Sequence, residues 1–277
     1  SNYLNIPLIT IWRFSKKYKN VFNFRIDIDP ENRATKEVAL KNIHNTIELC
    51  KENKNKISFA VNLSRFSKEK KFLKKYITND FDFHSHNFYH CLFFNKSINK
   101  YNILKADNYL NELGIKNFGF FSPEYYWYNN SAQIFDDLNY PFASSFGFDH
   151  NNYSYYPIIK NKIMNYLEVP YNSINFGLIK RDVTKDIEEI FKVFKNSIIA
   201  NYYKYITPCF FYDHPTNIGK NISYFSDLLK FVEEVDDLFP ITISNWVKWF
   251  KKKEEVLMNL IFSYNQLNNQ LKLNLLK

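Results

Sequence analysis

Acidic and histidine side chains occur in two short runs of the sequence, at spacings that suit a metal ion. Asp27 and Asp29 alternate with isoleucines, so both carboxylates point to one face if this run is a β-strand. His86 and His90 are four residues apart and share a face if the chain turns helical there. Two neutral imidazoles and one carboxylate suit a borderline cation such as Zn²⁺ and leave positions open for catalysis. We therefore predict a metal site formed by Asp29, His86 and His90.

Each run also has a simpler interpretation. Two close carboxylates are costly unless one binds a cation or the pair shares a proton, which favours one metal ligand and one general base. The alternative for the first run is a solvated strand edge, or an ion pair with Arg25, which lies on the same strand face. The alternative for the histidines, which include His84, is a chance cluster in a surface turn rich in Tyr and His.

A further histidine, His214, follows the apolar run CFFYD and precedes Pro215. A lone histidine is more often structural than catalytic. Its place after an apolar strand favours a side chain that points toward the same site, and we take it as the candidate general acid. The neighbouring Asp213 is not expected to face the same way.

The segments that must position these residues alternate between strand and helix patterns. Strand patterns span residues 21–28, 56–63, 81–86, 118–121, 142–145, 166–169, 209–212 and 241–242. Helical patterns span residues 35–52, 67–76, 97–113, 132–138, 184–195, 223–234 and 244–251. Strands that repeatedly precede helices indicate an α/β protein of parallel β/α units, and favour a barrel. In such a barrel the chemistry lies at the carboxyl ends of the strands, where the residues above fall.

The composition argues against several other classes of protein. The 277 residues fit one large α/β domain or two small ones, and a hydrophobic content of 45% is enough for a sizeable core. With only five glycines, the chain has neither of the glycine-rich phosphate loops of nucleotide-binding folds. The net charge of +9 comes mostly from scattered lysines, so we expect no nucleic-acid partner.

The cysteines and the C-terminal segment give weaker indications. Three cysteines that lie far apart predict reduced thiols and a cytoplasmic location. No apolar run reaches the ~18 residues that cross a membrane, so no membrane span is expected. Leu271, Leu273 and Leu275 alternate with polar residues after an Asn-Asn pair, which predicts a β-hairpin. We divide the chain into a catalytic barrel, residues 1–252, and a C-terminal hairpin extension, residues 253–277.

Segments in a fixed order resemble the polysaccharide deacetylases of carbohydrate esterase family 4, which share the NodB-homology domain. FRIDID resembles the acidic end of that family's first strand, and ISFAVNL resembles its second strand. HNFYH resembles the histidine metal motif, with Asn87 in the place of Ser or Thr. GFFSPEYYW resembles the Arg-x-Pro segment, YPFASSFGFD the next strand, and YLEVP and CFFYDHP the later strands. The resemblance runs from about residue 21 to residue 250.

The resemblance implies a distorted (β/α)7 barrel that holds one divalent metal ion. It implies that Asp27 is the general base, that Asp29, His86 and His90 bind the metal, and that His214 is the general acid. Zn²⁺ is the expected ion, and the same donors accept cobalt, nickel, manganese or iron. The implied reaction removes an N-acetyl group from an amino sugar in a surface polysaccharide or glycolipid pathway. The alternatives are an amide hydrolase with a non-sugar substrate and a catalytically impaired glycan-binding relative.

Two departures from the family pattern bear on catalysis. The family's acidic pair is adjacent, whereas Ile28 separates Asp27 from Asp29. The family's Arg in the Arg-x-Pro segment, which holds the base carboxylate in place, is Phe121 here. Arg25 is a candidate substitute, because it shares the strand face of Asp27.

Aromatic residues close behind Pro123 are candidate walls for the substrate. They are Tyr125, Tyr126 and Trp127. Arg25 and Pro123 are further candidates for contact with the substrate. Ordinary loop packing is the alternative interpretation of the aromatic residues.

Overall fold

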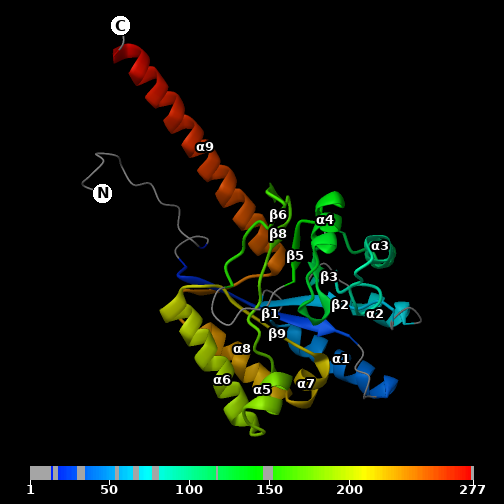
Figure 1. The fold of residues 1–277 in the computed structure, drawn as a ribbon. Helices are drawn as coiled ribbons and strands as arrows, with labels where there is room; N and C mark the ends of the chain where they lie inside the picture. The colour runs from blue at the N-terminus through cyan, green and yellow to red at the C-terminus, as the bar shows by residue number, and fades with distance from the viewer. Residues whose placement is uncertain are drawn as a thin grey trace.

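A parallel β-sheet, curled into a distorted barrel and covered by helices, organises the molecule (Figure 1). The structure is a computed structural model of the 277-residue chain and describes residues 14, 18–29, 35–53, 56–64, 69–76, 81–116, 118–145 and 152–275. Within these ranges the side chains of residues 36, 70, 260–265 and 267–275 are left aside. The β/α barrel expected from the sequence is confirmed.

The strands of this sheet are all parallel to their partners. Their order is β10-β1-β2-β3-β4-β5-β8, and β9 also pairs with β1. The backbone N–H of Asn172, after β8, donates to the carbonyl of Phe210 on β9 and so joins the segment after β8 to the strand that pairs with β1. The strands are β1 (Asn20–Ile28), β2 (Ile57–Val61), β3 (Asp82–Ser85), β4 (Phe120–Phe121), β5 (Phe142–Ser144), β8 (Leu167–Glu168), β9 (Cys209–Asp213) and β10 (Leu238–Pro240).

Helices follow most of these strands and pack outside the sheet. α1, α7, α8 and α6 are neighbours on one side of the barrel, and α3 and α4 are neighbours on another (Figure 1). Asn95 and Asp186 begin α3 and α6 with side-chain caps, as is common for Asn and Asp. The helices are α1 (Lys36–Cys50), α2 (Lys70–Tyr76), α3 (Lys96–Glu112), α4 (Asn129–Asp137), α5 (Phe176–Asp182), α6 (Ile187–Ile199), α7 (Pro215–Lys220), α8 (Ile222–Glu234) and α9 (Ile243–Leu275).

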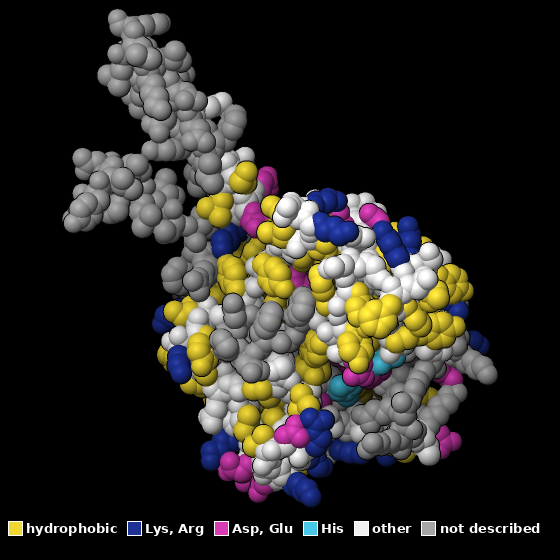
Figure 2. All heavy atoms as spheres, viewed as in Figure 1, with side chains coloured by type: hydrophobic (Ala, Val, Ile, Leu, Met, Phe, Trp, Pro, Cys, Tyr) yellow, Lys and Arg dark blue, Asp and Glu magenta, His cyan; other side chains and the backbone are white. Residues whose placement is uncertain are grey.

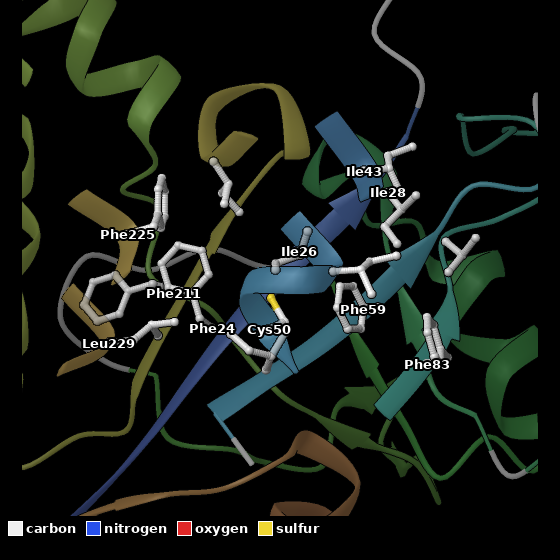
Figure 3. Close-up of a cluster of buried hydrophobic side chains, with 14 of the residues drawn as sticks. Phe24, Ile26, Ile28, Ile43, Cys50, Phe59, Phe83, Phe211, Phe225 and Leu229 are labelled. Atoms are coloured by element: carbon white, nitrogen blue, oxygen red, sulfur yellow. The ribbon is translucent and has the colours of Figure 1, made fainter. Parts of the chain in front are cut away.

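Alternation along β1 separates the core from the site. Phe24, Ile26 and Ile28 belong to the main hydrophobic cluster between the sheet and the helices, together with side chains of α1, α8 and β9 (Figure 3). The polar residues between them, Arg25 and Asp27, are also buried, at 1% and 2% exposure, but face the inside of the barrel. The hydrophobic face therefore fixes the strand, and the strand then holds the polar side chains in the interior.

The prediction of a C-terminal β-hairpin is wrong. The last predicted helix, at residues 244–251, continues as α9 to Leu275 and extends away from the barrel (Figure 1). Trp246, Val247 and Phe250 bury the start of this helix. The chain after Pro240 has neither Gly nor Pro and contains many Lys and Leu residues, so nothing in it breaks the helix. The proposed boundary at residue 252 falls inside α9 and stays a prediction.

Other differences are local. The last strand lies at Leu238–Pro240 instead of residues 241–242, and α5 and α7 were not predicted. A small hairpin of β6 (Ile158–Ile159) and β7 (Lys162–Ile163), a 3₁₀ turn at Pro123–Tyr125 and a π-helical turn at Ala200–Tyr205 complete the described elements. Among the residues that the structure describes, no helix combines the length and the apolar character that crossing a membrane requires.

Candidate functional site

The residues predicted to do chemistry meet at one edge of the barrel. Asp29 directly follows β1, His86 follows β3, and His214 follows β9. Because these strands are parallel, their carboxyl ends share this edge. Figure 2 shows histidine side chains beside acidic ones here, with hydrophobic side chains gathered next to them.

Asp29, His86 and His90 form the candidate metal site. Their ligand atoms all lie within 4.8 Å of one another. The Nε2 atoms of His86 and His90 are 2.9 Å apart, and His90 Nε2 is 3.2 Å from Asp29 Oδ2. Donor atoms that share an ion at about 2.1 Å lie roughly 2.9–3.4 Å apart for bond angles of about 90–110°. The three side chains therefore fit one divalent ion.

His86 is held so that one ring nitrogen faces this site. Its Nδ1 lies 2.9 Å from the carbonyl oxygen of Phe121, which can only accept, so the Nδ1–H donates. In the neutral ring Nε2 then keeps its lone pair, as a metal ligand must. Burial lowers the pKa of His86 to about 4, against the opposing effect of the Asp27 charge.

The turn after β3 brings His90 back toward His86. The sequence suggested a helical turn, but the described backbone here is a series of bends. Asn87 has φ 66°, a left-handed conformation that Asn tolerates well. Its side chain accepts from the Phe88 N–H and donates to the Cys91 carbonyl, so the turn is held from both sides.

Asp29 is a charged carboxylate that the fold leaves partly unsatisfied. Burial by itself would raise its pKa, but the hydrogen bond from His90 and the charge of His214 hold the pKa of Asp29 well below its usual range. Its Oδ1 is buried and has no hydrogen-bond partner among the described residues. An anionic oxygen in this state suits a cation.

Asp27 lies deeper and forms an ion pair with Arg25. Arg25 Nη2 donates to Asp27 Oδ2 over 2.6 Å, and Arg25 Nε lies 2.6 Å from Asp27 Oδ1, so the ion pair has two contacts. Burial by itself would lower the pKa of Arg25, but the charge and hydrogen bond of Asp27, together with Tyr125 and Tyr171, outweigh burial and raise this pKa above its ordinary value. This ion pair was one of the alternatives for the acidic run, and it occurs beside the candidate metal site.

Four aromatic rings surround the guanidinium of Arg25. Its Cζ is 4.8 Å from the ring centroid of Phe121, 5.1 Å from that of Tyr125, 5.0 Å from that of Tyr171 and 4.8 Å from that of Tyr212. Cations are attracted to ring faces at such distances, and more strongly when water is excluded. We call Arg25 and these four rings the arginine box.

The arginine box explains how Phe121 can stand where the resemblance places an Arg. The Phe121 ring forms one wall of the box, and its carbonyl orients His86. The cation comes instead from Arg25, two residues before Asp27 on β1. The sequence pointed to Arg25 from the strand alternation, and the structure places it against Asp27 as expected.

His214 reaches the site from the end of β9. Its Nε2 is 3.7 Å from Asp29 Oδ1, and its Nδ1 is 3.9 Å from Oδ1 of the buried Asp213. Asp213 accepts from the backbone N–H groups of His214 and Phe176 and from the side chain of Asn217. Asp213 was not expected to face the site, yet its carboxylate ties the His214 backbone to the starts of α5 and α7.

The candidate substrate walls separate into different environments. Tyr125 belongs to the arginine box, and its hydroxyl lies 3.3 Å from Arg25 Nη2. Pro123 is buried, and Trp127 is half-buried and packs against the cluster under α4. Tyr126 is 51% exposed, which makes it accessible to a ligand.

Sequence reasoning missed Tyr171 and Tyr212, which close the arginine box. A usable signal was present for Tyr212, because it is two residues from Phe210 on β9, and both face the interior. Tyr171 follows a two-residue strand, too short for its pattern to show a face.

No protein-family model matches the sequence, and no curated protein sequence matches it significantly. Solved structures do match the fold. A polysaccharide deacetylase from Mycobacterium smegmatis aligns with a TM-score of 0.73 at 12% identity, over 87% of this chain and 93% of that one. Puue allantoinase aligns with a TM-score of 0.68 at 10% identity, over 85% and 91%. A CE4 family pseudoenzyme from Bacillus anthracis aligns with a TM-score of 0.50 at 12% identity, over 77% and 62%. The chain thus has the polysaccharide deacetylase fold.

Proposed function

We propose that this protein is a metal-dependent hydrolase that removes an N-acetyl group from an amino sugar of a surface polysaccharide or glycolipid. The observation that carries the proposal is the convergence of ligand atoms from Asp29, His86 and His90 within 4.8 Å. His214 lies at the same site, and Asp27 is close enough for its charge to act on His86.

Asp29, His86 and His90 would hold the ion, with Zn²⁺ as the first choice and cobalt, nickel, manganese or iron as others that such donors accept. A divalent ion bound there would polarise the amide carbonyl and lower the pKa of a water molecule. The partner of His86 Nδ1 is the Phe121 carbonyl, so the ring cannot rotate without losing a buried hydrogen bond.

Asp27 is the proposed general base. It takes the proton of the attacking water as the water oxygen bonds to the carbonyl carbon. Arg25 holds the orientation of the carboxylate through two contacts of 2.6 Å. The four rings of the arginine box in turn hold Arg25. Each carboxylate oxygen still has a lone pair for the proton, since an ionised carboxylate offers about four acceptor positions.

His214 is the proposed general acid. The carbon–nitrogen bond breaks as His214 gives a proton to the leaving nitrogen, and the products are acetate and a free amine. The carboxylates of Asp213 and Asp29 lie 3.9 and 3.7 Å from its two ring nitrogens, and their charges favour the protonated ring that a general acid needs. Its side chain is 29% exposed, so a leaving group at the surface can reach it.

An N-acetylated carbohydrate is the proposed substrate class because the chain shares its fold with a polysaccharide deacetylase. The allantoinase of the same fold supports a second candidate, a non-sugar amide. Exposed aromatic side chains beside the site, among them Tyr126, favour the carbohydrate.

A catalytically impaired relative is the other candidate, since a CE4 family pseudoenzyme has a similar fold and the motif Arg is absent here. Two observations oppose it. Arg25 supplies the missing cation to Asp27, and all three ligand side chains are present with suitable spacing.

The test is acetate release from a panel of N-acetylated glycans by protein loaded with Zn²⁺. We expect release that is lost in Asp27→Asn, a variant of nearly the same shape without the base. Asp107→Asn is the control, since Asp107 is a partly buried carboxylate on α3 that accepts a hydrogen bond from Tyr140 and takes no part in the site. Zinc-loaded protein that releases no acetate from any glycan, or equal release by Asp27→Asn, contradicts the proposal.

A further inference from the structure

The part of α9 that extends away from the barrel carries no charged residue between Glu255 and Lys272. Residues 256–271 read VLMNLIFSYNQLNNQL. A helix that lies in solvent normally carries charged side chains or ion pairs along its exposed face. This stretch has none, although Figure 1 shows it leaving the barrel, and Val256 and Met258 at its start are 40% and 66% exposed. We call residues 256–271 the helical arm.

Apolar residues recur in the arm at alternating intervals of three and four. Leu257, Leu260, Tyr264, Leu267 and Leu271 occupy positions a and d of a seven-residue repeat. Because α9 is helical through the whole arm, these positions share one face of it. We call these five positions the apolar seam. Such a repeat is typical of a helix that pairs with another helix.

The same repeat runs back into the start of α9, where the barrel covers it. Trp246 and Phe250 occupy the preceding d and a positions and are 0% and 6% exposed. Lys253, at the next d position, donates to the Tyr153 hydroxyl over 2.6 Å, and the Tyr156 ring centroid lies 6.4 Å from that of Phe250. The barrel therefore packs on this face of α9 as far as Lys253, and the arm carries the same face beyond it.

The opposite face of the arm is polar without being charged. Its positions b, c and f are mostly Asn and Gln, and Asn259 and Gln266, one repeat apart at position c, are exposed. Positions e and g, where charges select the partner in a coiled coil, also hold no charge. A helix that lies on a membrane surface is rich in Lys and Arg on its polar face, so this composition favours a protein partner.

A second copy of this chain meets these requirements. Its arm presents the same repeat, so the two seams match over their whole length of about 21 Å, at 1.5 Å per residue. Because the arm has no charged residue, two identical arms meet without like-charge repulsion.

The barrel fixes the direction in which two arms can pair. At the start of α9 the barrel covers the face that continues as the seam. In a parallel pair both barrels would have to occupy the space between the two helices. In an antiparallel pair each barrel lies beyond the far end of the partner's arm, so both barrels have room.

We infer that the helical arm is a self-association surface, on which the arm of a second copy packs antiparallel to form a homodimer. In one and the same view, α9 leaves the barrel on the side away from the histidines (Figures 1 and 2). Pairing of the arms therefore leaves the candidate site of each copy uncovered. The inference does not depend on the proposed deacetylase activity.

The test measures the mass of the full chain by sedimentation equilibrium over a range of protein concentrations. We expect the mass of two chains, where one chain has 33.4 kDa. Leu260→Lys combined with Leu267→Lys, both at position d, should raise the dissociation constant at least about 100-fold, because it places charges in the seam. Leu260→Ala combined with Leu267→Ala keeps good helix formers and should raise it at least about tenfold.

Asn259→Lys combined with Gln266→Lys is the matched control. It adds the same charges one residue earlier in the helix, on the polar face, and should leave the dissociation constant unchanged. Near-ultraviolet circular dichroism, which reports on buried rings such as Trp246, should be the same for all three double variants and the unaltered protein. Loss of the dimer is then not loss of the fold. Small-angle X-ray scattering of the dimer should show two separated barrels.

Each other outcome contradicts a defined part of the inference. A single-chain mass at every concentration overturns it, and so does a dimer that the Lys variant of the seam leaves intact. A dimer that the control variant dissociates equally overturns the choice of face, and scattering from two barrels in contact overturns the antiparallel direction. A single-chain mass with co-sedimentation on phosphatidylglycerol vesicles, lost in the seam variant, assigns the arm to a membrane surface and overturns the second copy.

Discussion

His84 and His86 lie two residues apart at the end of the same strand, yet their surroundings are opposite. His84 Nε2 is 2.8 Å from Asp82 Oδ2, and its Nδ1 accepts from the Gly119 N–H. His86 has a protein carbonyl on Nδ1 only, and its Nε2 faces another imidazole nitrogen. A ring whose two nitrogens are both engaged by the fold is structural. A ring with one nitrogen left toward a second ligand is available for chemistry.

The partners of His84 form a closed network inside the barrel. Asp82 also accepts from the Ser58 hydroxyl and from both the N–H and the hydroxyl of Ser244. It thereby ties β2 and β3 to the start of α9. Gly119 has no freedom to change, because a Cβ there would lie 2.2 Å from the Phe142 ring. We call these contacts of His84 and Asp82 the lower network, in contrast to the open candidate metal site at the strand ends.

The largest expected effect distinguishes the two histidines directly. His86→Ala should reduce acetate release at least about 1,000-fold, because an ion that polarises the carbonyl supplies several kcal/mol. His84→Ala should retain zinc binding while the protein unfolds at a lower urea concentration. Steady-state rates and urea titrations of both variants measure this. Equal losses of activity in His86→Ala and His84→Ala, with the stability of both unchanged, would contradict the assignment of His86 to the candidate site and of His84 to the fold.

The next effect concerns the lower network. Asp82→Ala should lower the free energy of unfolding by about 3 kcal/mol, because it leaves buried donors of Ser58, Ser244 and His84 without their acceptor. Asp237→Ala is the matched control. Its partner Lys19 is exposed, so the loss should be within about 1 kcal/mol. Urea unfolding followed by circular dichroism gives both values, and similar losses would argue against the network.

A third effect tests the arginine box. Arg25→Lys keeps the charge but loses the two-pronged contact, and should lower kcat roughly thirtyfold while zinc affinity stays nearly the same. Arg181→Lys, at an exposed Arg that pairs with Asp182, should change neither quantity. Steady-state kinetics and calorimetric zinc titration separate the two readouts. A large loss of zinc affinity in Arg25→Lys would show that the box serves the metal and not the base.

The smallest effect is the pH dependence of stability from Asp82. Burial alone would raise its pKa, but contacts with His84 and Ser244 outweigh burial and lower the pKa of Asp82 from 3.8 to about 2. The folded state then binds fewer protons than the unfolded state, so this contribution of about 2 kcal/mol is complete above about pH 5 and is lost as the pH falls from about 4 to about 2. The free energies of unfolding of the unaltered protein and of Asp82→Asn, measured in urea, should converge as the pH falls across this range. A difference that stays constant with pH would contradict the assignment.

The contrast between His84 and His86 also shows how much of the candidate site could be predicted from the sequence. Asp27 and Asp29 were predicted as site residues from their alternation with isoleucines, His86 and His90 from their spacing, and His214 from its place after an apolar strand. Their meeting at one edge needs only that the strands are parallel. The geometry of the site was thus accessible, whereas its metal and substrate stay proposals.

What the sequence could not predict depends on distant contacts. The role of His84 requires Asp82 and the Gly119 backbone, and nothing local distinguishes it from His86. The arginine box collects Phe121, Tyr125, Tyr171 and Tyr212 from different elements, two of them on very short segments. The prediction of a C-terminal hairpin was wrong because it rested on three alternating leucines. They lie at the end of a long stretch of helix-forming residues without a breaker, and this stretch forms α9.

The central claim, that Asp29, His86 and His90 hold one divalent ion, is tested most directly by calorimetric titration of chelator-treated protein with Zn²⁺. We predict one ion per chain, an affinity reduced at least about 100-fold in His90→Ala, and no change in His44→Ala, whose half-exposed ring contacts Tyr76 on α2. Absence of stoichiometric binding by the unaltered protein, or equal binding by His90→Ala, would contradict the claim.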